Sequence, residues 1–521
     1  MESSWNWMAW QDPLDARRYR QSHPVVPASV APAELETAVQ ALQQRGWRFF
    51  GLVVEEGAEE PSVWQLTYVW CARHTPWLLL EVASRQDAVP SVSATVFAAD
   101  WPEREAEDLF GLHFTGHPQL GDFVLHDEDW GEDLSPMRRD FHQRRQHSQG
   151  VGESYRPPRI LEAAGGFLMP VGPVFSGPQE SIRFLLETVG EEIVHAHVRL
   201  FYKYRGIEQL MQGRRPEDAL LLAERVNGPQ AFAHALAFAQ ALETLSPVPV
   251  PVRARALRTV LAEMERIRMH VRALAGIVES TGLAVPTNLL DAVEERLLQL
   301  SAAYLGHRYL FGVAAIGGLA LDLPDEAVRA LAQQLQSEIK QVVEVCGRLS
   351  FDNSFLDRLE MVGRLSREEA GSSGAVGPIA RASAVVNDLR DWQPYAYYED
   401  MPPPLVTESE GDGYARFRVF RREIEVAADL IERISRDMPA GPVRVEARPA
   451  GGTGLGAVEA PSGALVYWLR VNDQGRLARC HIMTPALMNW HALPAAVQAF
   501  AFQDFPIILA TFGLSVADAD R

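Results

Sequence analysis

Hydrophobic and polar residues follow two different periods along the chain, and this divides it into two parts. From residue 31 to about residue 141, alternating and continuous apolar runs are typical of β-strands, with one amphipathic helix before them. From residue 216 onward, apolar residues recur at helical spacing over long stretches, as in a buried bundle. The pattern predicts an α+β protein in which a small N-terminal α/β domain precedes a mostly α-helical bundle domain with peripheral β-strands.

The N-terminal domain, residues 31–141, is expected to be a sheet with helices on one side. One helix is expected at 32–45, and a second begins at Asp100, its predicted cap, and ends at Gly111. The acidic stretch 103–108 in the second helix has three interpretations: a metal or acid/base cluster, a solvated face, or a face for another subunit. The strands are expected at 47–55, 63–73, 77–82 and 91–97.

The second domain, residues 166–521, is expected to follow a polar, glycine-bearing linker at 142–165. Strand pairs are expected between 181–187 and 192–203 and between 443–447 and 464–471. The long helices are expected at 216–245, 252–280, 286–311 and 324–349.

The helix expected at 216–245 contains a break, Asn227-Gly228-Pro229-Gln230. Glycine and proline disfavour a helix interior, and a break leaves backbone N–H and C=O groups that need other partners. A plain corner between two helices is one interpretation. The other is that the break presents groups to a functional site.

Charge and composition narrow the possible partners. The 521 residues carry a formal net charge of −19, which argues against nucleic acid or an anionic membrane surface as the main partner. Residues 1–30 carry Trp5, Trp7 and Trp10 without the pattern of a signal peptide, and we expect this arm to dock on a partner. The most apolar run, 309–321, is too short to span a bilayer, so we expect other subunits to provide any membrane attachment.

Two kinds of cofactor site are not supported by the sequence. The three cysteines, Cys71, Cys346 and Cys480, form no C-x-x-C pair, which excludes an evident zinc ribbon or iron–sulfur cluster and fits a reducing compartment. No G-x-G-x-x-G loop follows a strand, so direct NADH binding is unsupported. Any link to NAD would pass through other subunits.

Two sets of motifs resemble one known group of redox complexes. W-x-E-R-E-x-x-D-L-F-G-x-x-F-x-G-H-P at 101–118, with L-S-P-M-R-R-D-F at 134–141, resembles the C-type subunit of NADH-quinone oxidoreductase. The second half resembles the D-type subunit and, more closely, the large subunit of formate-hydrogenlyase-type nickel-iron hydrogenases, in which the two domains are fused. Its matching motifs are PVGP at 170–173, RGIE at 205–208, EMERIRMH at 263–270, GPIARAS at 377–383, EGDGYAR at 410–416, PALMNWHAL at 485–493 and the C-terminal Asp520-Arg521.

The resemblance implies a subunit of a membrane-associated redox complex. It implies a cytoplasmic place on the inner face of the cell membrane, held there by partner subunits. The implied partners are a small iron–sulfur subunit that carries the cluster, membrane antiporter-like and quinone-module subunits, and other hydrophilic redox subunits.

The resemblance also shows which residues of this chain stand at the nickel-ligand positions of hydrogenases. In hydrogenase relatives two cysteine pairs bind nickel, and their positions correspond here to Asn227, Gln230, Ser515 and Asp518. Two amides, a hydroxyl and a carboxylate are hard, weak ligands that do not suit this centre. We expect no nickel-iron centre and no metal ligands in this chain. These four positions become candidate cofactor-binding residues instead.

In the complex I relatives the same cavity holds a quinone between a His and a Tyr. Those positions correspond here to Gln179 and Gly228, neither of which can replace the proton-donating pair, although Gln179 can donate a hydrogen bond. Quinone remains the candidate ligand, with His234 expected to line the cavity. The candidate catalytic residues are Glu180, Arg381 and His270; for His270 a buried network between helices is the structural alternative.

Three functions follow from these observations. The first is a nickel-free subunit of C/D type that couples electron transfer, with quinone as the candidate acceptor, to ion movement. The second is a non-catalytic scaffold or assembly subunit of such a complex. The third, a working hydrogenase with unusual ligands, ranks last. Whether the chain is itself catalytic stays open.

Overall fold

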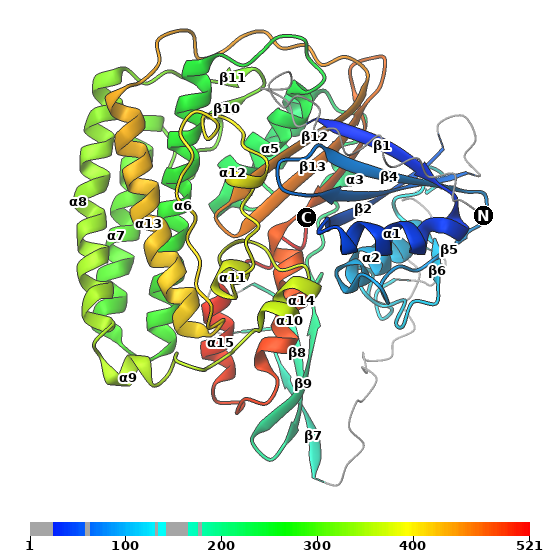
Figure 1. The fold of residues 1–521 in the computed structure, drawn as a ribbon, viewed down its shortest axis with the longest axis horizontal. Helices are drawn as coiled ribbons and strands as arrows, with labels where there is room; N and C mark the ends of the chain where they lie inside the picture. The colour runs from blue at the N-terminus through cyan, green and yellow to red at the C-terminus, as the bar shows by residue number, and fades with distance from the viewer. Residues whose placement is uncertain (1–23, 58–62, 131–133, 142–164, 176–179) are drawn as a thin grey trace.

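The computed structural model describes residues 24–57, 63–130, 134–141, 165–175 and 180–521. It confirms the predicted α+β architecture, with a long helical bundle on one side and a small α/β domain on the other (Figure 1). The expected linker, apart from Gly165, and the arm up to residue 23 lie outside the described residues. No helix in the described part of the chain combines the length and apolar character that a bilayer span requires.

The N-terminal domain is built on a four-stranded sheet whose order is β1-β4-β3-β2. The first three strands predicted from the sequence are confirmed, and α1 (Leu35–Gln44) follows a 3-10 turn at Pro32–Glu34. The sheet gains one strand that the sequence did not indicate, because β1 pairs in parallel with β4. The domain therefore begins inside the segment that was predicted to be an arm. The strands are β1 (Val25–Val30), β2 (Arg48–Glu56), β3 (Trp64–Cys71) and β4 (Trp77–Ser84).

The predictions for residues 91–111 are partly wrong. No strand forms at 91–97, because buried Glu103 accepts a hydrogen bond from the Val92 N–H at 2.8 Å and holds a turn there. Asp100 is not a cap but the first residue of α2 (Asp100–Phe110). Its carboxylate instead lies 3.2 Å from His117, while Gly111 ends the helix as predicted, with φ of 69°. The other elements here are β5 (Ala88–Pro90), a 3-10 turn at Phe97–Ala99 and β6 (His113–Thr115).

A four-helix bundle forms the largest part of the second domain. Apolar faces of its helices meet in one continuous core, as the helical spacing of the sequence predicted. The helix expected at 286–311 ends earlier, at Leu305, where Gly306 adopts φ of 77°. The bundle helices are α6 (Val252–Ser280), α7 (Ala284–Leu305), α8 (Asp325–Leu349) and α13 (Gly413–Arg436).

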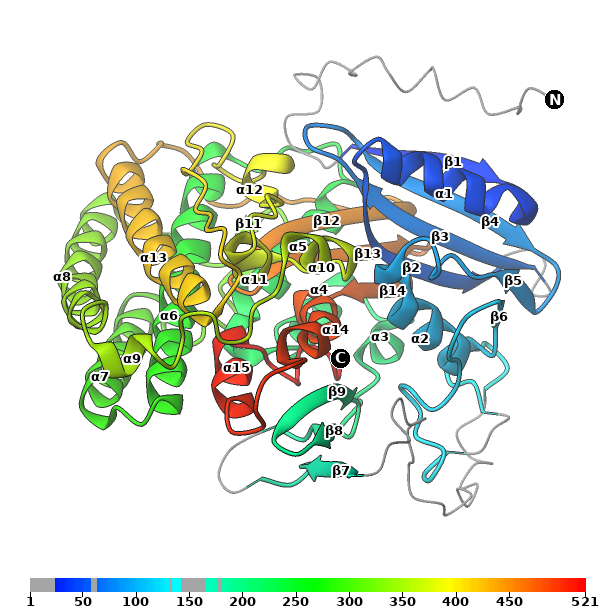
Figure 2. The ribbon, with the colours of Figure 1, turned by 60° about the horizontal axis from the view of Figure 1, so that its bottom comes forward.

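A three-stranded sheet lies between the bundle and the N-terminal domain (Figure 2). Its strands are β12 (Gly452–Ala460), β13 (Gly463–Val471) and β14 (Leu477–Met483). The predicted partner of β13, residues 443–447, is wrong: β12 pairs with it, while Arg444 bridges to Gly318. Helix α5 (Ala231–Glu243) packs on this sheet so closely that a Cβ at Gly456 would lie 2.0 Å from the Ala237 carbonyl oxygen.

Shorter elements complete the second domain. The predicted hairpin is confirmed as β8 and β9, which β7 extends to three strands. The remaining elements are β7 (Gly166–Val171), β8 (Arg183–Val189), β9 (Glu192–Arg199), α3 (Ile207–Met211), α4 (Pro216–Ala223), β10 (Ala314–Ala315), β11 (Gly318–Leu319), α9 (Asn353–Leu356), α10 (Arg367–Ser372), α11 (Gly377–Ala382), α12 (Leu389–Trp392), α14 (Pro485–Val497) and α15 (Phe505–Phe512).

An apolar cluster joins the two domains. Phe50, Trp77 and their neighbours on β2–β4 pack against Trp468 and Met483 of the second domain. Gly51 allows this approach, because a Cβ there would lie 2.6 Å from Cγ of Met483. The α/β domain is therefore part of one continuous hydrophobic structure with the bundle domain.

Removing a large side chain from this cluster should destabilise the protein. Trp77 is 0% exposed and packs edge-on against Phe50 with ring centroids 5.0 Å apart. Trp77→Ala should lower the free energy of unfolding by about 3–5 kcal/mol, measured by urea denaturation. The control Phe351→Ala, at a residue that is 89% exposed, should change it by less than about 0.5 kcal/mol. Equal effects of the two substitutions would contradict the interdomain core.

Candidate functional site

The predicted helix at 216–245 is broken as the sequence indicated. Helix α4 ends at Ala223, a 3-10 turn occupies Gly228–Gln230, and α5 begins at Ala231. Side chains of α6 satisfy the backbone groups that the break exposes. The Glu265 carboxylate accepts hydrogen bonds from the N–H groups of Phe232 and Ala233 in α5, both at 2.9 Å, and Arg268 donates to a carbonyl of the turn.

Arg205 satisfies the other side of the break. Its guanidinium donates to the carbonyls of Arg225 and Val226, at 2.8 and 2.7 Å. The same group donates to the carbonyls of Ala517 and Asp520 near the C-terminus. Arg205 therefore ties the broken helix to the C-terminal segment. Sequence reasoning missed this role, although Arg205 lies in the matching R-G-I-E motif.

The first pair of candidate positions lies in the break itself. Asn227 is buried, and among the described residues nothing accepts a hydrogen bond from its Nδ2. Gln230 is also buried, and its Oε1 accepts a hydrogen bond from Ser462 at 2.9 Å. Gly228, between them, is half-buried. The break thus contains one buried amide donor that has no partner among the described residues.

The second pair of candidate positions, Ser515 and Asp518, lies in the C-terminal segment, and each side chain binds a different partner. The Ser515 hydroxyl donates to the exposed carboxylate of Glu180 at 3.0 Å. Glu180 also accepts from the N–H groups of Val516 and Ala517. Glu180 therefore stabilises this loop. Its neighbour Gln179 lies outside the described residues.

Asp518 belongs to a buried triad with His234 and Tyr467. Nε2 of His234 lies 2.9 Å from Asp518 Oδ1, and Nδ1 lies 2.8 Å from the Tyr467 hydroxyl. All three side chains are at most 1% exposed. Burial raises the pKa of Tyr467 well above its ordinary value, so the phenol stays protonated and can donate to Nδ1. In that arrangement Nε2–H donates to the carboxylate. Nothing in the apolar strand around Tyr467 signalled this role.

Arg381 and His270 lie in a different environment, a buried network of charged side chains. Arg381 donates to Glu423 and Glu459, both at 2.7 Å, and Nε2 of His270 lies 2.8 Å from Glu423. Burial would raise the pKa of Glu423, but Arg381 and His270 outweigh it and lower that pKa well below its ordinary value. In the described part of the chain no hydrogen bond or ion pair joins Arg381 or His270 to the four candidate positions above. This network is the structural alternative named for His270.

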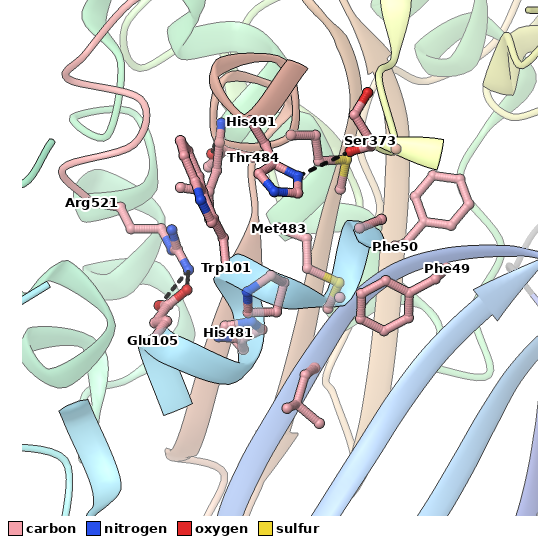
Figure 3. Close-up of a pocket in the computed structure, with 17 residues that line it drawn as sticks. Phe49, Phe50, Trp101, Glu105, Ser373, His481, Met483, Thr484, His491 and Arg521 are labelled. Atoms are coloured by element: carbon pink, nitrogen blue, oxygen red, sulfur yellow. Dashed lines mark hydrogen bonds and ion pairs between the residues drawn. The ribbon is translucent and has the colours of Figure 1, made fainter. Parts of the chain in front are cut away.

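The acidic stretch of α2 is mostly buried, so a solvated face is the wrong interpretation for it. Glu103 and Glu105 are buried, and Asp108 accepts hydrogen bonds from three successive N–H groups. Glu105, Glu208 and His481 bring ligand-type atoms within 4.8 Å of one another. The guanidinium of Arg521 binds both of these carboxylates (Figure 3 shows its contact with Glu105).

Family models match most of the chain. The model described as the 30 Kd subunit of respiratory-chain NADH dehydrogenase matches residues 28–147. The model of its 49 Kd subunit matches residues 282–451 and 446–521. Between them, the model of nickel-dependent hydrogenase matches residues 205–273.

Individual relatives span both domains. Formate hydrogenlyase subunit 5 of Escherichia coli (strain K12) is 32% identical over 454 residues, which cover 85% of this chain and 78% of that protein. The chain belongs to the hydrogenase and complex I family of fused C/D-type subunits. Hydrogenase-4 component G of the same strain is 29% identical over 455 residues, and the C/D-type subunit of NADH-quinone oxidoreductase from Acinetobacter baumannii (strain AYE) is 26% identical over 469. They cover 85% and 81% of the chain and 78% of each relative.

This membership makes the chain a redox subunit and confirms the resemblance drawn from its motifs. The donors of the chain do not fit the nickel site of a C/D-type hydrogenase. None of the four candidate positions offers a thiolate, and the side chains of three of them already bind Ser462, Glu180 and His234.

Arg381→Ala tests whether this residue is structural. The substitution removes the cation nearest to Glu423 and the one ion-pair partner that Glu459 has among the described residues, so it should lower the free energy of unfolding by about 3–5 kcal/mol in urea denaturation. The control Arg348→Ala removes an exposed ion pair with Glu344 and should cost less than about 1 kcal/mol. A variant as stable as the parent but deficient only in redox turnover would instead support the predicted catalytic role.

Glu265 should make the stability of the broken helix depend on pH. Burial raises the pKa of Glu265 from 4.5 to about 7. The unfolded chain therefore releases this proton first, so the stabilisation is complete below about pH 4.5 and is lost as pH rises through about 7. Relative to Glu265→Gln, the parent should lose on the order of 3 kcal/mol over this range.

Urea denaturation of the parent and Glu265→Gln at several pH values measures this difference. The control Glu326→Gln, at an exposed residue in the first turn of α8, should follow the parent at every pH. A constant difference between the parent and Glu265→Gln from pH 5 to pH 8 would contradict the proposed titration.

Proposed function

We propose that the chain is a nickel-free C/D-type subunit of a membrane-associated redox complex, in which electron transfer is coupled to ion movement. The observation that carries the proposal is the broken helix. Its architecture is complete, with Glu265, Arg268 and Arg205 satisfying the backbone, while the four metal-ligand positions of hydrogenase relatives hold amide, hydroxyl and carboxylate groups. The fold supports a ligand site there without thiolate chemistry.

A quinone is the ligand that these groups favour. Asn227 has a buried donor with no partner among the described residues, and Gly228 next to it is half-buried. A quinone carbonyl is an acceptor that such an amide can bind, and a buried unpaired donor gains most from this contact. The Tyr467–His234–Asp518 triad would be the proton-bearing group of this region, because His234 lies in α5, the helix that begins at the break.

The partner subunits are inferred from the family and from the surface at the break. Relatives are named as subunits of a hydrogenlyase, a hydrogenase and a quinone oxidoreductase. The exposed Arg225 lies over the ring of Phe311, 5.4 Å from its centroid, beside the half-buried Gly228. We assign this surface to a small iron–sulfur subunit that delivers electrons. Membrane antiporter-like, quinone-module and other hydrophilic subunits would hold the chain at the inner face of the cell membrane.

Asn227→Ala tests the quinone site. In the native complex, a short-chain ubiquinone analogue should slow hydrogen exchange at residues 225–234, and the substitution should weaken its binding about tenfold, as one lost hydrogen bond predicts. Asn288→Ala, at an exposed residue of α7, is the matched control and should bind like the parent. Equal binding by both variants would contradict the role of Asn227.

A scaffold is the second candidate function, because Arg381 and His270 are engaged in a structural network. The hydrogen-exchange experiment with the ubiquinone analogue distinguishes a scaffold from a quinone-binding subunit. A native complex that assembles with its iron–sulfur and membrane subunits but shows no protection by the quinone analogue would favour a scaffold. Purified complex without any iron–sulfur subunit would contradict the redox assignment.

A further inference from the structure

A small cavity lies where the N-terminal domain meets the C-terminal end of the chain (Figure 3). Its volume of about 30 Å³ is room for about one water molecule. Both domains contribute to its walls. Trp101 and Glu105 come from α2, while His481, His491 and Arg521 come from the second domain.

Arg521 is the residue that joins the two sides. Its Nη2 lies 2.6 and 2.7 Å from the two oxygens of Glu105, and its Nε donates to Glu208 at 3.0 Å. The side chain is 1% exposed, and Nη1 has no hydrogen-bond partner among the described residues. One nitrogen of Arg521 thus contacts Glu105 and another contacts Glu208, so the guanidinium fixes the two carboxylates relative to each other.

The buried carboxylates of Glu105 and Glu208 require a cation between them, and Arg521 supplies it. Burial would raise the pKa of Glu208, but His481, Arg521 and Arg479 outweigh it and hold that pKa below its ordinary range. Burial would lower the pKa of Arg521, yet Glu105 and Glu208 raise it. The Glu208 carboxylate is therefore ionised and the Arg521 guanidinium charged. Without Arg521, Glu105 would keep no ion-pair partner among the described residues.

The same short segment reaches the candidate site. Asp518, three residues before Arg521, lies 2.9 Å from His234. Between them, the Asp520 carboxylate accepts a hydrogen bond from the Phe201 N–H, and the Asp520 carbonyl accepts one from Arg205. The anchored residues Asp518, Asp520 and Arg521 lie within one short segment, so we expect a displacement of Arg521 to shift the backbone that carries Asp518.

We propose that Glu105 and Arg521 are a pair of positioning residues through which the N-terminal domain holds the C-terminal wall of the site. Glu105 touches none of the groups that line the broken helix, but it fixes the residue that places Asp518 against His234. The α/β domain thus contributes to the site through one buried ion pair. The inference rests on the proposed function only in that it concerns the same site.

Histidine resonances test the proposal in the full-length chain. In protein labelled with ¹⁵N-histidine, the ring signals of His234 are assigned by their loss in His234→Gln. Glu105→Gln should shift these signals and speed amide hydrogen exchange at residues 515–521 by about tenfold. Arg521→Lys, which keeps a charge but lacks the second nitrogen that holds Glu208 while the first holds Glu105, should give a smaller shift in the same direction.

Glu103→Gln is the matched control. Glu103 is a buried carboxylate on the same helix, but it binds Ser91 and Val92 within its own domain. It should lower stability and leave His234 unchanged. Equal His234 signals in the parent, Glu105→Gln and Arg521→Lys would overturn the positioning role, as would an equal shift in Glu103→Gln. These readouts need no redox turnover, so a failed quinone assay leaves them intact, and their failure leaves the quinone assay intact.

Discussion

The structure depends on how one interrupted helix satisfies its own backbone. Between α4 and α5 the chain exposes N–H and C=O groups that cannot stay unpaired in a buried place. Glu265 and Arg268 from α6 satisfy one side, and Arg205 satisfies the other while it binds the C-terminal segment. Hydrogen bonds from the Arg205 side chain therefore join the break to the C-terminal segment.

The same solution, a buried charge with a complementary partner, recurs across the molecule. Arg381 with Glu423 joins α11 to α13, and Arg521 with Glu105 joins the C-terminus to the N-terminal domain. Such pairs contribute modest net stability, because desolvation offsets much of their attraction, but they strongly penalise any other geometry. Such ion pairs can therefore hold the residues of the candidate site in one arrangement, even though the polar groups of that site are weak metal ligands.

Sequence predicted the parts that depend on periodicity and on local breakers. The bundle, three strands of the first sheet and the Asn227–Gln230 break follow from apolar spacing and from glycine and proline. The sequence pattern could not predict β1, because its partner β4 is distant in sequence. It also did not predict the pairing of β12 with β13. The site shows the same limit: Asn227 and Asp518 were found from motifs, whereas the contact of His234 with Tyr467 depends on tertiary packing.

The central claim is that hydrogen bonds have replaced nickel chemistry at the broken helix. Metal analysis of the native complex, purified from cells grown with nickel, tests it most directly. The account predicts iron from the partner subunit and no nickel bound to this chain, and the same iron content in the Asp518→Asn variant. Stoichiometric nickel that is lost in Asp518→Asn would contradict the account, because it would show Asp518 to be a metal ligand and not the partner of His234.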